Sequence, residues 1–229
     1  MRTIGLIGGM SWESTAVYYR EANELVRNRL GGLNSARIAL ASLNFQEISE
    51  LQQAAKWDEA GERLADAARW LEAGGADMIL ICTNTMHLLV DRVQAAVSVP
   101  VLHIGDVAAE AVRERGLEKV ALLGTSFTME KAFYRDRIAG HGIEVVVPGA
   151  ADREAIHGAI FGELAMGVVS DATRETFRGI IRRLVDDGAE GIILGCTEIE
   201  LLVSQADSPV PVFPTAKLHI EAAVDRALA

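Results

Sequence analysis

The sequence lacks the features that mark membrane proteins and nucleic-acid-binding proteins. None of its apolar runs approaches the roughly 18 residues that a membrane-spanning helix needs, and no signal-peptide pattern precedes the first apolar segment. The 229 residues carry 22 basic and 32 acidic side chains, a net charge of −10, with no basic cluster. An acidic surface argues against nucleic acid or an anionic membrane as a partner. We therefore expect a cytoplasmic protein that acts on a small molecule.

Cysteine and lysine are both scarce. The two cysteines have no Cys-x-x-Cys or Cys/His spacing, so no zinc site is expected, and thiols stay reduced in the cytosol. The chain has four lysines, and only Lys217 is close to a predicted strand end, where a Schiff base with pyridoxal phosphate could form. We expect neither a metal nor an organic cofactor.

The two cysteines lie in near-copies of one segment. Residues 76–85 read ADMILICTNT and residues 189–198 read AEGIILGCTE, each an apolar run that ends in Cys-Thr. Two thiols at equivalent places in two half-chains suggest one site between the halves. A thiol on each side suits the removal of a proton from one face of a carbon and its return to the other.

The repeat extends beyond the cysteines. A buried strand that opens into a small-residue loop precedes each one, with 74 residues from Gly8 to Cys82 and 72 from Gly124 to Cys196. Val-Pro-Val follows each at residues 99–101 and 210–212. A duplicated unit of about 100 residues is longer than the period of stacked repeat arrays and implies two lobes. We expect residues 1–100 plus 213–229 to form the first lobe and residues 101–212 the second.

Alternating strands and helices predict an α/β fold. Unbroken aliphatic runs indicate buried parallel strands at residues 3–7, 38–43, 78–81, 99–102, 120–123, 145–147, 192–194 and 210–213. Helical patterns at 12–30, 47–73 and 173–187 each stop at glycine, which favours a left-handed cap. Each lobe is therefore expected to be a parallel βαβ sheet flanked by helices.

Ligands of open α/β sheets bind beyond the carboxyl ends of the strands. The loops expected there are 8–11, 82–85, 124–126 and 196–198. Each cysteine would stand near the start of a helix, whose unpaired N–H groups favour a thiolate, so we expect a lowered thiol pKa. Such a thiol can serve as base or acid. Neutral donors that could hold a carboxylate are Thr83, Asn84, Thr85, Ser126 and Thr197.

Other residues allow less specific interpretations. Ser11 is expected to be the N-cap of its helix. His87 is expected to pack or cap, although it could touch substrate. Glu198 could orient a substrate ammonium group or cap the helix after Cys196. The glycine-rich opening lacks both the dinucleotide and the phosphate-loop fingerprint.

Three motifs resemble those of the aspartate/glutamate racemase family of cofactor-independent amino-acid racemases. They are GLIGGMSWEST at 5–15, CTNTMH at 82–87 and LGCTEI at 194–199, and the resemblance spans essentially the whole chain. It implies two lobes related by pseudo-twofold symmetry, a cleft between them, and commonly a homodimer. It makes Cys82 and Cys196 the acid/base pair. The substrate would be lined by Met10, Asn84, Thr85, Thr125, Ser126, Thr197 and Glu198, with Gln52 as a weaker candidate.

The sequence departs from aspartate-specific relatives in one respect. They place basic groups in the segment after the second strand and in the helix before Ser170. Residues 43–49 and 163–167 contain no lysine or arginine here. A broader or less acidic substrate is expected.

Two alternatives stay open. Within the same superfamily, the chain could be a cysteine-dependent isomerase or decarboxylase of a dicarboxylate such as maleate or a malonate. In a different class, it could be a non-catalytic protein that senses a small carboxylate.

Overall fold

The computed structural model describes all residues, 1–229, and the chain divides into two compact units. Unit 1 comprises Met1–Ile104 and His219–Ala229, and unit 2 comprises Gly105–Leu218. The chain thus changes units four and six residues later than the sequence suggests. The reason is strand pairing: the strand at Val101–Leu102 pairs in unit 1, and the strand at Val212–Pro214 pairs in unit 2.

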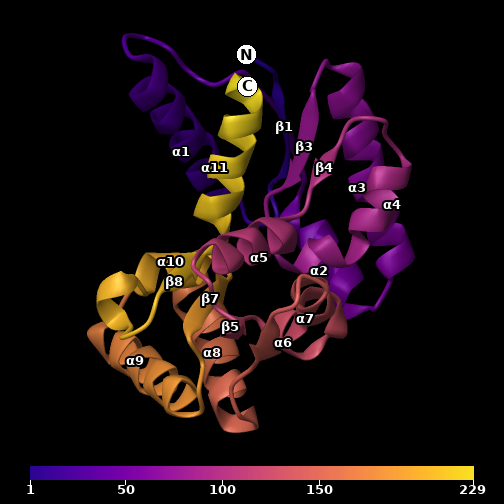
Figure 1. Ribbon diagram of the computed structural model, residues 1–229. Coiled ribbons are helices and arrows are strands. Elements are labelled where there is room, and N and C mark those ends of the chain that lie inside the picture. Colours follow the sequence, from indigo (N-terminus) through magenta and orange to yellow (C-terminus); the bar gives the residue numbers. More distant parts are fainter. The chain divides into compact units, whose positions relative to one another are not determined.

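Unit 1 is built on a four-stranded parallel sheet in the order β2-β1-β3-β4. The strands are β1 (Ile4–Gly8), β2 (Ile38–Ser42), β3 (Met78–Ile81) and β4 (Val101–Leu102). Its helices are α1 (Trp12–Leu30), α2 (Phe45–Gln53), α3 (Trp57–Ala73), η1 (Thr85–Leu89) and α4 (Val90–Ala95). Figure 1 shows α1 and the end of α11 on one side of this sheet and α3 and α4 on the other. The two chain ends meet where Arg2 N–H donates to the Ala227 carbonyl at 2.9 Å.

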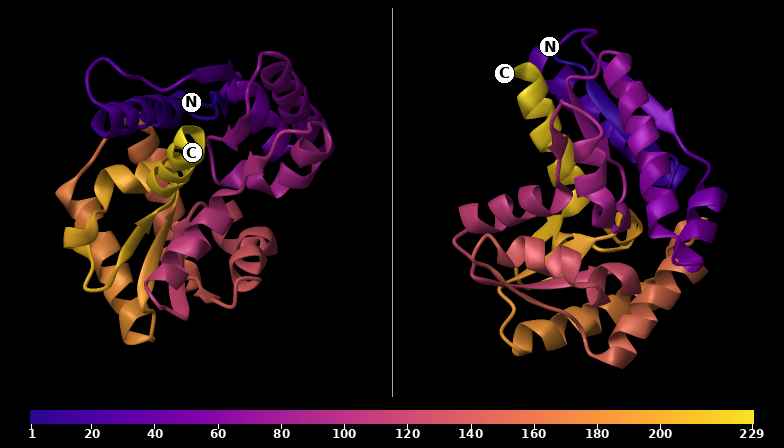
Figure 2. Two further views of the ribbon diagram at one scale, coloured as in Figure 1. Left: turned by 45° about the horizontal axis from the view of Figure 1, so that its top comes forward. Right: turned by 90° about the vertical axis from the view of Figure 1, so that its right-hand side faces the viewer.

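Unit 2 repeats this order of strands as β6-β5-β7-β8, again all parallel. The strands are β5 (Lys119–Gly124), β6 (Glu144–Val146), β7 (Gly191–Gly195) and β8 (Val212–Pro214). The helices are α5 (Ile104–Glu114), α6 (Ser126–Glu130), α7 (Ala132–Ala139), α8 (Ala150–Gly162), η2 (Leu164–Met166), α9 (Asp171–Asp186), α10 (Thr197–Leu202) and η3 (Gln205–Asp207). The last helix, α11 (Thr215–Leu228), begins in unit 2 and passes into unit 1 at His219. Figure 2 shows α8 and α9, in orange tones, along one face of this sheet and α5 along the other.

The central strands of both sheets are buried along their whole apolar length, as expected for parallel strands covered on two faces. In unit 2, Leu123 and Leu194 pack with Phe177 of α9. In unit 1, Ile79 and Ile81 pack with residues of α3. The edge strands β2 and β6 are only half buried, in contrast to the continuous burial expected, because each has a neighbour on one side alone.

All eight predicted strands are confirmed, with shifts of one or two residues at their ends. The predicted long helix at 47–73 is wrong, because it is two helices, α2 and α3. Lys56 N–H donates to the Leu51 carbonyl at 2.8 Å and Ala55 adopts φ 55°. This is a Schellman cap with alanine in the position that usually takes glycine, so the sequence carries no glycine to mark it.

The structure contains no helix that is both long enough and apolar enough to span a membrane.

Candidate functional site

Each cysteine directly follows the last paired residue of a central strand. Ile7 pairs with Ile81 in unit 1 and Gly124 pairs with Gly195 in unit 2. Cys82 and Cys196 come next, at the carboxyl ends of β3 and β7 where ligands of such sheets bind. Both are buried free thiols, with exposed fractions of 1% and 7%. The two units therefore present their thiols at the same topological position.

In unit 1, hydrogen bonds join β1 and the first turn of α1 to the backbone of Cys82. Ser14 Oγ donates to the Cys82 carbonyl at 3.0 Å, and Cys82 N–H donates to the Ile7 carbonyl at 2.9 Å. Thr15 Oγ1 accepts from Gly9 N–H at 2.8 Å. These contacts fix the backbone that carries the thiol. The sequence analysis did not predict a role for Ser14 or Thr15, although both are polar residues on the buried face of α1.

The predicted substrate residues of unit 1 lie on these same loops, with one exception. Met10 and Asn84 are buried, and Ser11, Thr83 and Thr85 are partly buried. Ser11 is the N-cap of α1, as predicted, since its Oγ accepts from Ser14 N–H at 3.2 Å. The exception is Gln52, which lies on α2 and donates from Nε2 to Met86 Sδ at 2.8 Å.

His87 ties the loop after Cys82 to the end of unit 1. Its Nδ1 lies 2.9 Å from the Thr83 carbonyl, and its Nε2 accepts from Ile104 N–H at 3.2 Å. The ring therefore carries its proton on Nδ1 and is neutral. His87 packs and caps, as predicted, and it does so between the loop after Cys82 and Ile104, the last residue before the chain enters unit 2.

Two further buried histidines surround His87. Its ring centroid lies 4.9 Å from that of His103 and 5.7 Å from that of His219. His219 Nε2 lies 3.1 Å from the Leu102 carbonyl, and its Nδ1 lies 3.0 Å from the Tyr18 hydroxyl. Burial holds the pKa of His87 well below its ordinary value and lowers the pKa of His219 to about 3.

These histidines predict a loss of stability in mild acid. The folded-state pKa of His219 lies below the unfolded value of about 6.5, so the unfolded chain binds the proton more tightly and stability falls as pH drops from 6.5 toward 3. At pH 5 the free energy of unfolding should be about 2 kcal/mol lower than at pH 7 because of His219 alone. Urea unfolding at both values should show a smaller pH effect in His219→Gln than in the wild type. His157→Gln, in unit 2, controls for the loss of a histidine, and an unchanged pH effect in His219→Gln would contradict the assignment.

In unit 2, the carboxylate of Glu198 faces the thiol. Cys196 is the N-cap of α10, and its Sγ donates to Glu198 Oε2 at 2.8 Å. Thr197 Oγ1 donates to the same oxygen at 2.9 Å. Two residues further on, Glu200 Oε1 accepts from Ala216 N–H at 2.9 Å, and burial raises the pKa of Glu200 to about 8. Sequence reasoning missed Glu200, which only its place two residues after Glu198 on the same short helix could have suggested.

The other predicted residues of unit 2 follow β5. Thr125 is the buried N-cap of α6, where its Oγ1 accepts from Thr128 N–H at 3.3 Å. Ser126 is partly buried, and its N–H donates to His157 Nδ1 at 3.3 Å. His157 therefore positions this loop, a role that its sequence spacing does not reveal. Gly124 pairs with Gly195, so the loops after β5 and β7 start side by side.

The expected lowering of the cysteine pKa values is wrong. Burial raises the pKa of Cys82. Burial also raises the pKa of Cys196, and the neighbouring Glu198 carboxylate adds to that increase. Backbone N–H groups at the start of α10 act in the opposite direction, as expected, but more weakly. Both thiols are thus protonated, and desolvation dominates over the helix terminus.

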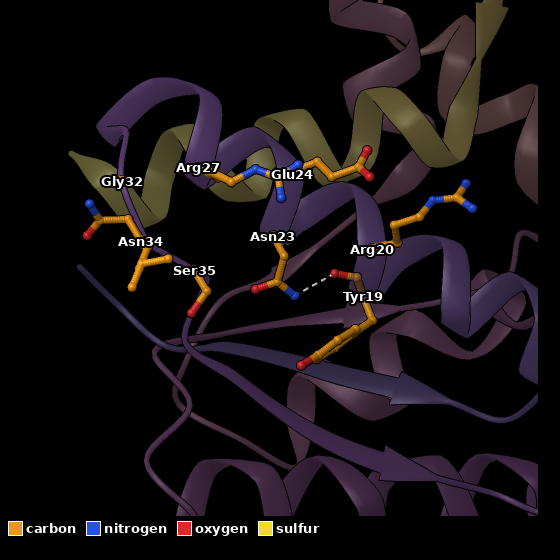
Figure 3. Close-up of a pocket in the computed structure, with 9 residues that line it drawn as sticks. Tyr19, Arg20, Asn23, Glu24, Arg27, Gly32, Asn34 and Ser35 are labelled. Carbon is orange, nitrogen blue, oxygen red and sulfur yellow. Dashed lines mark hydrogen bonds between the residues drawn. The ribbon is translucent and has the colours of Figure 1, made fainter.

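A surface pocket of about 420 Å³ lies apart from either cysteine (Figure 3). It is lined by α1 and the loop that follows, namely Tyr19, Arg20, Asn23, Glu24, Arg27, Gly32, Leu33, Asn34 and Ser35. Charges of both signs face it, and the drawn hydrogen bond joins Asn23 Nδ2 to the Tyr19 carbonyl within the helix. It contains no residue expected to act on substrate.

The family model described as Asp/Glu/Hydantoin racemase matches residues 7–223. The chain belongs to this family. Racemases are isomerases, so the chain is an isomerase of the aspartate/glutamate racemase family, as its motifs predicted. The fold prediction is confirmed in the same way, since solved structures of this family share the α/β architecture.

Individual relatives match over their whole length. The broad specificity amino-acid racemase RacX of Bacillus subtilis is 24% identical over 99% of this chain and 98% of its own. A crystal structure described as an Asp/Glu racemase from Yersinia pestis is 48% identical, with a TM-score of 0.95 and full coverage of both chains. An aspartate racemase homologue from Pyrococcus horikoshii is 38% identical, with a TM-score of 0.90 and full coverage of both.

Proposed function

We propose that this enzyme racemises amino acids without a cofactor, using Cys82 and Cys196 on opposite faces of the same Cα. The observation that carries the proposal is the duplicated placement of the thiols. Two sheets of identical strand order each end a central strand in a buried, reduced cysteine that a threonine follows. Both thiols also lie at the carboxyl ends of their strands, where ligands of open α/β sheets bind.

The chemistry requires one thiolate and one thiol. The thiolate removes the α-proton, the thiol protonates the opposite face, and the roles exchange for the other enantiomer. The raised pKa values of the buried cysteines make each thiolate a stronger base once it forms. The hydroxyl, amide and loop N–H groups named above would hold the substrate carboxylate and the charge that develops on it. One such donor is typically worth about 3 kcal/mol in the transition state.

The substrate side chain is proposed to be neutral or variable. The segments 43–49 and 163–167 carry no cation. Within the second, Glu163 Oε2 is already bonded to Thr173 Oγ1 at 2.5 Å, and Met166 is 67% exposed. An apolar side chain contacts such a surface without the unpaired charge that a distal carboxylate would bring. The name of the RacX relative, a broad specificity racemase, points the same way.

A panel of single enantiomers tests this proposal. Each amino acid is incubated with the enzyme and the two enantiomers are separated by chiral chromatography. We expect interconversion of several neutral amino acids, with aspartate among the slower ones. Racemisation of aspartate alone would contradict the substrate assignment. Release of carbon dioxide from a malonate without any racemisation would favour the decarboxylase alternative.

We also propose a cytoplasmic homodimer, supported by the free cysteines and by apolar side chains on the surface of unit 1. Trp12 and Tyr19 of α1 are 68% and 55% exposed, and Leu33 is fully exposed in the loop that follows. Large exposed apolar groups that gather on one region often mark an interface. Light scattering should give about twice the chain mass of 24.6 kDa.

A further inference from the structure

The two thiols differ in what surrounds them. Cys196 Sγ and Thr197 Oγ1 both donate to one oxygen of Glu198, at 2.8 and 2.9 Å. An oxygen that takes two hydrogen bonds from neighbouring donors is typical of an ionised carboxylate, which only accepts. The proton between sulfur and oxygen therefore sits on sulfur. For Cys82, by contrast, burial alone raises the pKa of the thiol, and no charged group contributes to that increase.

We propose that Glu198 keeps the proton on Cys196, so that in the resting enzyme Cys196 is the acid and Cys82 becomes the first base. This inference rests on the proposed function and assigns the two cysteines their starting roles. It also gives Glu198 a function different from the contact with a substrate ammonium group or the helix cap that the sequence suggests.

The proton balance of the step follows from this arrangement. Cys82 first loses its own proton to solvent, because both thiols are protonated at rest. The resulting thiolate takes the α-proton, and the electron pair of the broken C–H bond stays on the substrate carbon. Cys196 then gives its proton to the opposite face, its S–H bond breaks, and a thiolate remains beside the Glu198 carboxylate. Two adjacent anions repel each other, so this thiolate is a strong base for the return reaction.

Glu200 provides a matched control on the same helix. Its carboxyl group bonds to the backbone of Ala216 and not to sulfur, and with a pKa of about 8 it is neutral at pH 7. Replacement of Glu200 by glutamine therefore changes no charge at that pH. The other titratable groups around this helix are Lys217 and Tyr134, which interact with Glu200. His157 accepts from Ser126 N–H in the loop after β5 and is not bonded to Cys196. Glu198 is thus the charged neighbour whose removal should lower the pKa of the Cys196 thiol.

The test measures Cys196 without any turnover. In a Cys82→Ser background, Cys196 is the one remaining thiol, and its alkylation by iodoacetamide at pH 7 reports the thiolate fraction. Glu198→Gln should raise that rate several-fold, because a lower pKa gives more thiolate but a less nucleophilic one. Glu200→Gln should leave the rate within about twofold. An unchanged or slower alkylation rate in Glu198→Gln would overturn the inference. Glu198→Ala, which also removes the charge, should raise the alkylation rate as well.

A second readout uses the full enzyme. For the enantiomer that Cys82 deprotonates, the alkaline limb of the kcat/KM profile reports loss of the Cys196 proton, so Glu198→Gln should move that limb to lower pH by about one unit or more. A general loss of structure would lower activity at every pH without moving the limb. The alkylation result does not depend on racemisation, so failure of the proposed function and failure of this inference give different outcomes.

Discussion

Replacement of Cys82 or Cys196 by alanine should each reduce racemisation by about 10³-fold or more, because either change removes one of the two groups that move the α-proton. Both side chains are buried, so the loss of one sulfur atom costs some stability as well. The initial rate at saturating substrate is measured by separating the two enantiomers with chiral chromatography. The double variant should be no slower than the slower single variant, since the two thiols act as a unit.

Val93→Ala is the control for this experiment. Val93 is fully buried on α4 in the core of unit 1, and its truncation opens a cavity of similar size without touching a thiol. It should retain near-normal activity. Activity close to the wild type in either cysteine variant would rule out a mechanism that needs both thiols.

Replacement of Gly9 by alanine should lower the free energy of unfolding by more than about 3 kcal/mol and abolish activity. Gly9 adopts φ 84°, and an added Cβ would lie 2.1 Å from the Leu43 carbonyl oxygen, which belongs to the backbone and cannot swing away. Leu43 N–H is bonded to the Gly8 carbonyl at 2.9 Å, so the two segments cannot separate without breaking the loop that carries Met10 and Ser11.

Gly75→Ala separates this clash from the conformational cost. Gly75 also has a positive φ, of 85°, but an added Cβ would meet no atom within 4 Å. We expect a cost of about 1 to 2 kcal/mol and full activity. Urea unfolding of the two variants tests the difference, and equal destabilisation would show that the close approach of Leu43 has no role.

The fold was largely predictable from the sequence because the signal was duplicated. Two copies of an apolar run that ends in Cys-Thr, each preceded by a strand and a glycine loop, indicate one unit made twice. The break between α2 and α3 was not predictable, because Ala55 takes a conformation that glycine normally marks. The unit boundaries depend on short strands such as β4, which acquire their place only by pairing with β3.

The candidate site was predictable in composition but not in energetics. The positions of Cys82, Asn84 and Thr125 on loops after the strands follow from the apolar pattern. The direction of the thiol pKa shifts does not, because it depends on how completely the surrounding residues exclude water. The contact between Cys196 and Glu198 and the bond from Ser14 to the Cys82 carbonyl depend on side-chain geometry that spacing does not fix.

The most direct measurement of the two-thiol mechanism is the isotope content of the first product formed in heavy water. A single enantiomer is incubated with enzyme, and the reaction is stopped after a few per cent conversion. The two enantiomers are then separated, and mass spectrometry measures the deuterium content of each. If one thiol removes the proton and a different, solvent-equilibrated thiol supplies the new one, the product carries deuterium at Cα while the remaining substrate carries none. Product that retains the original proton would show that a single group transfers it, and would contradict the account.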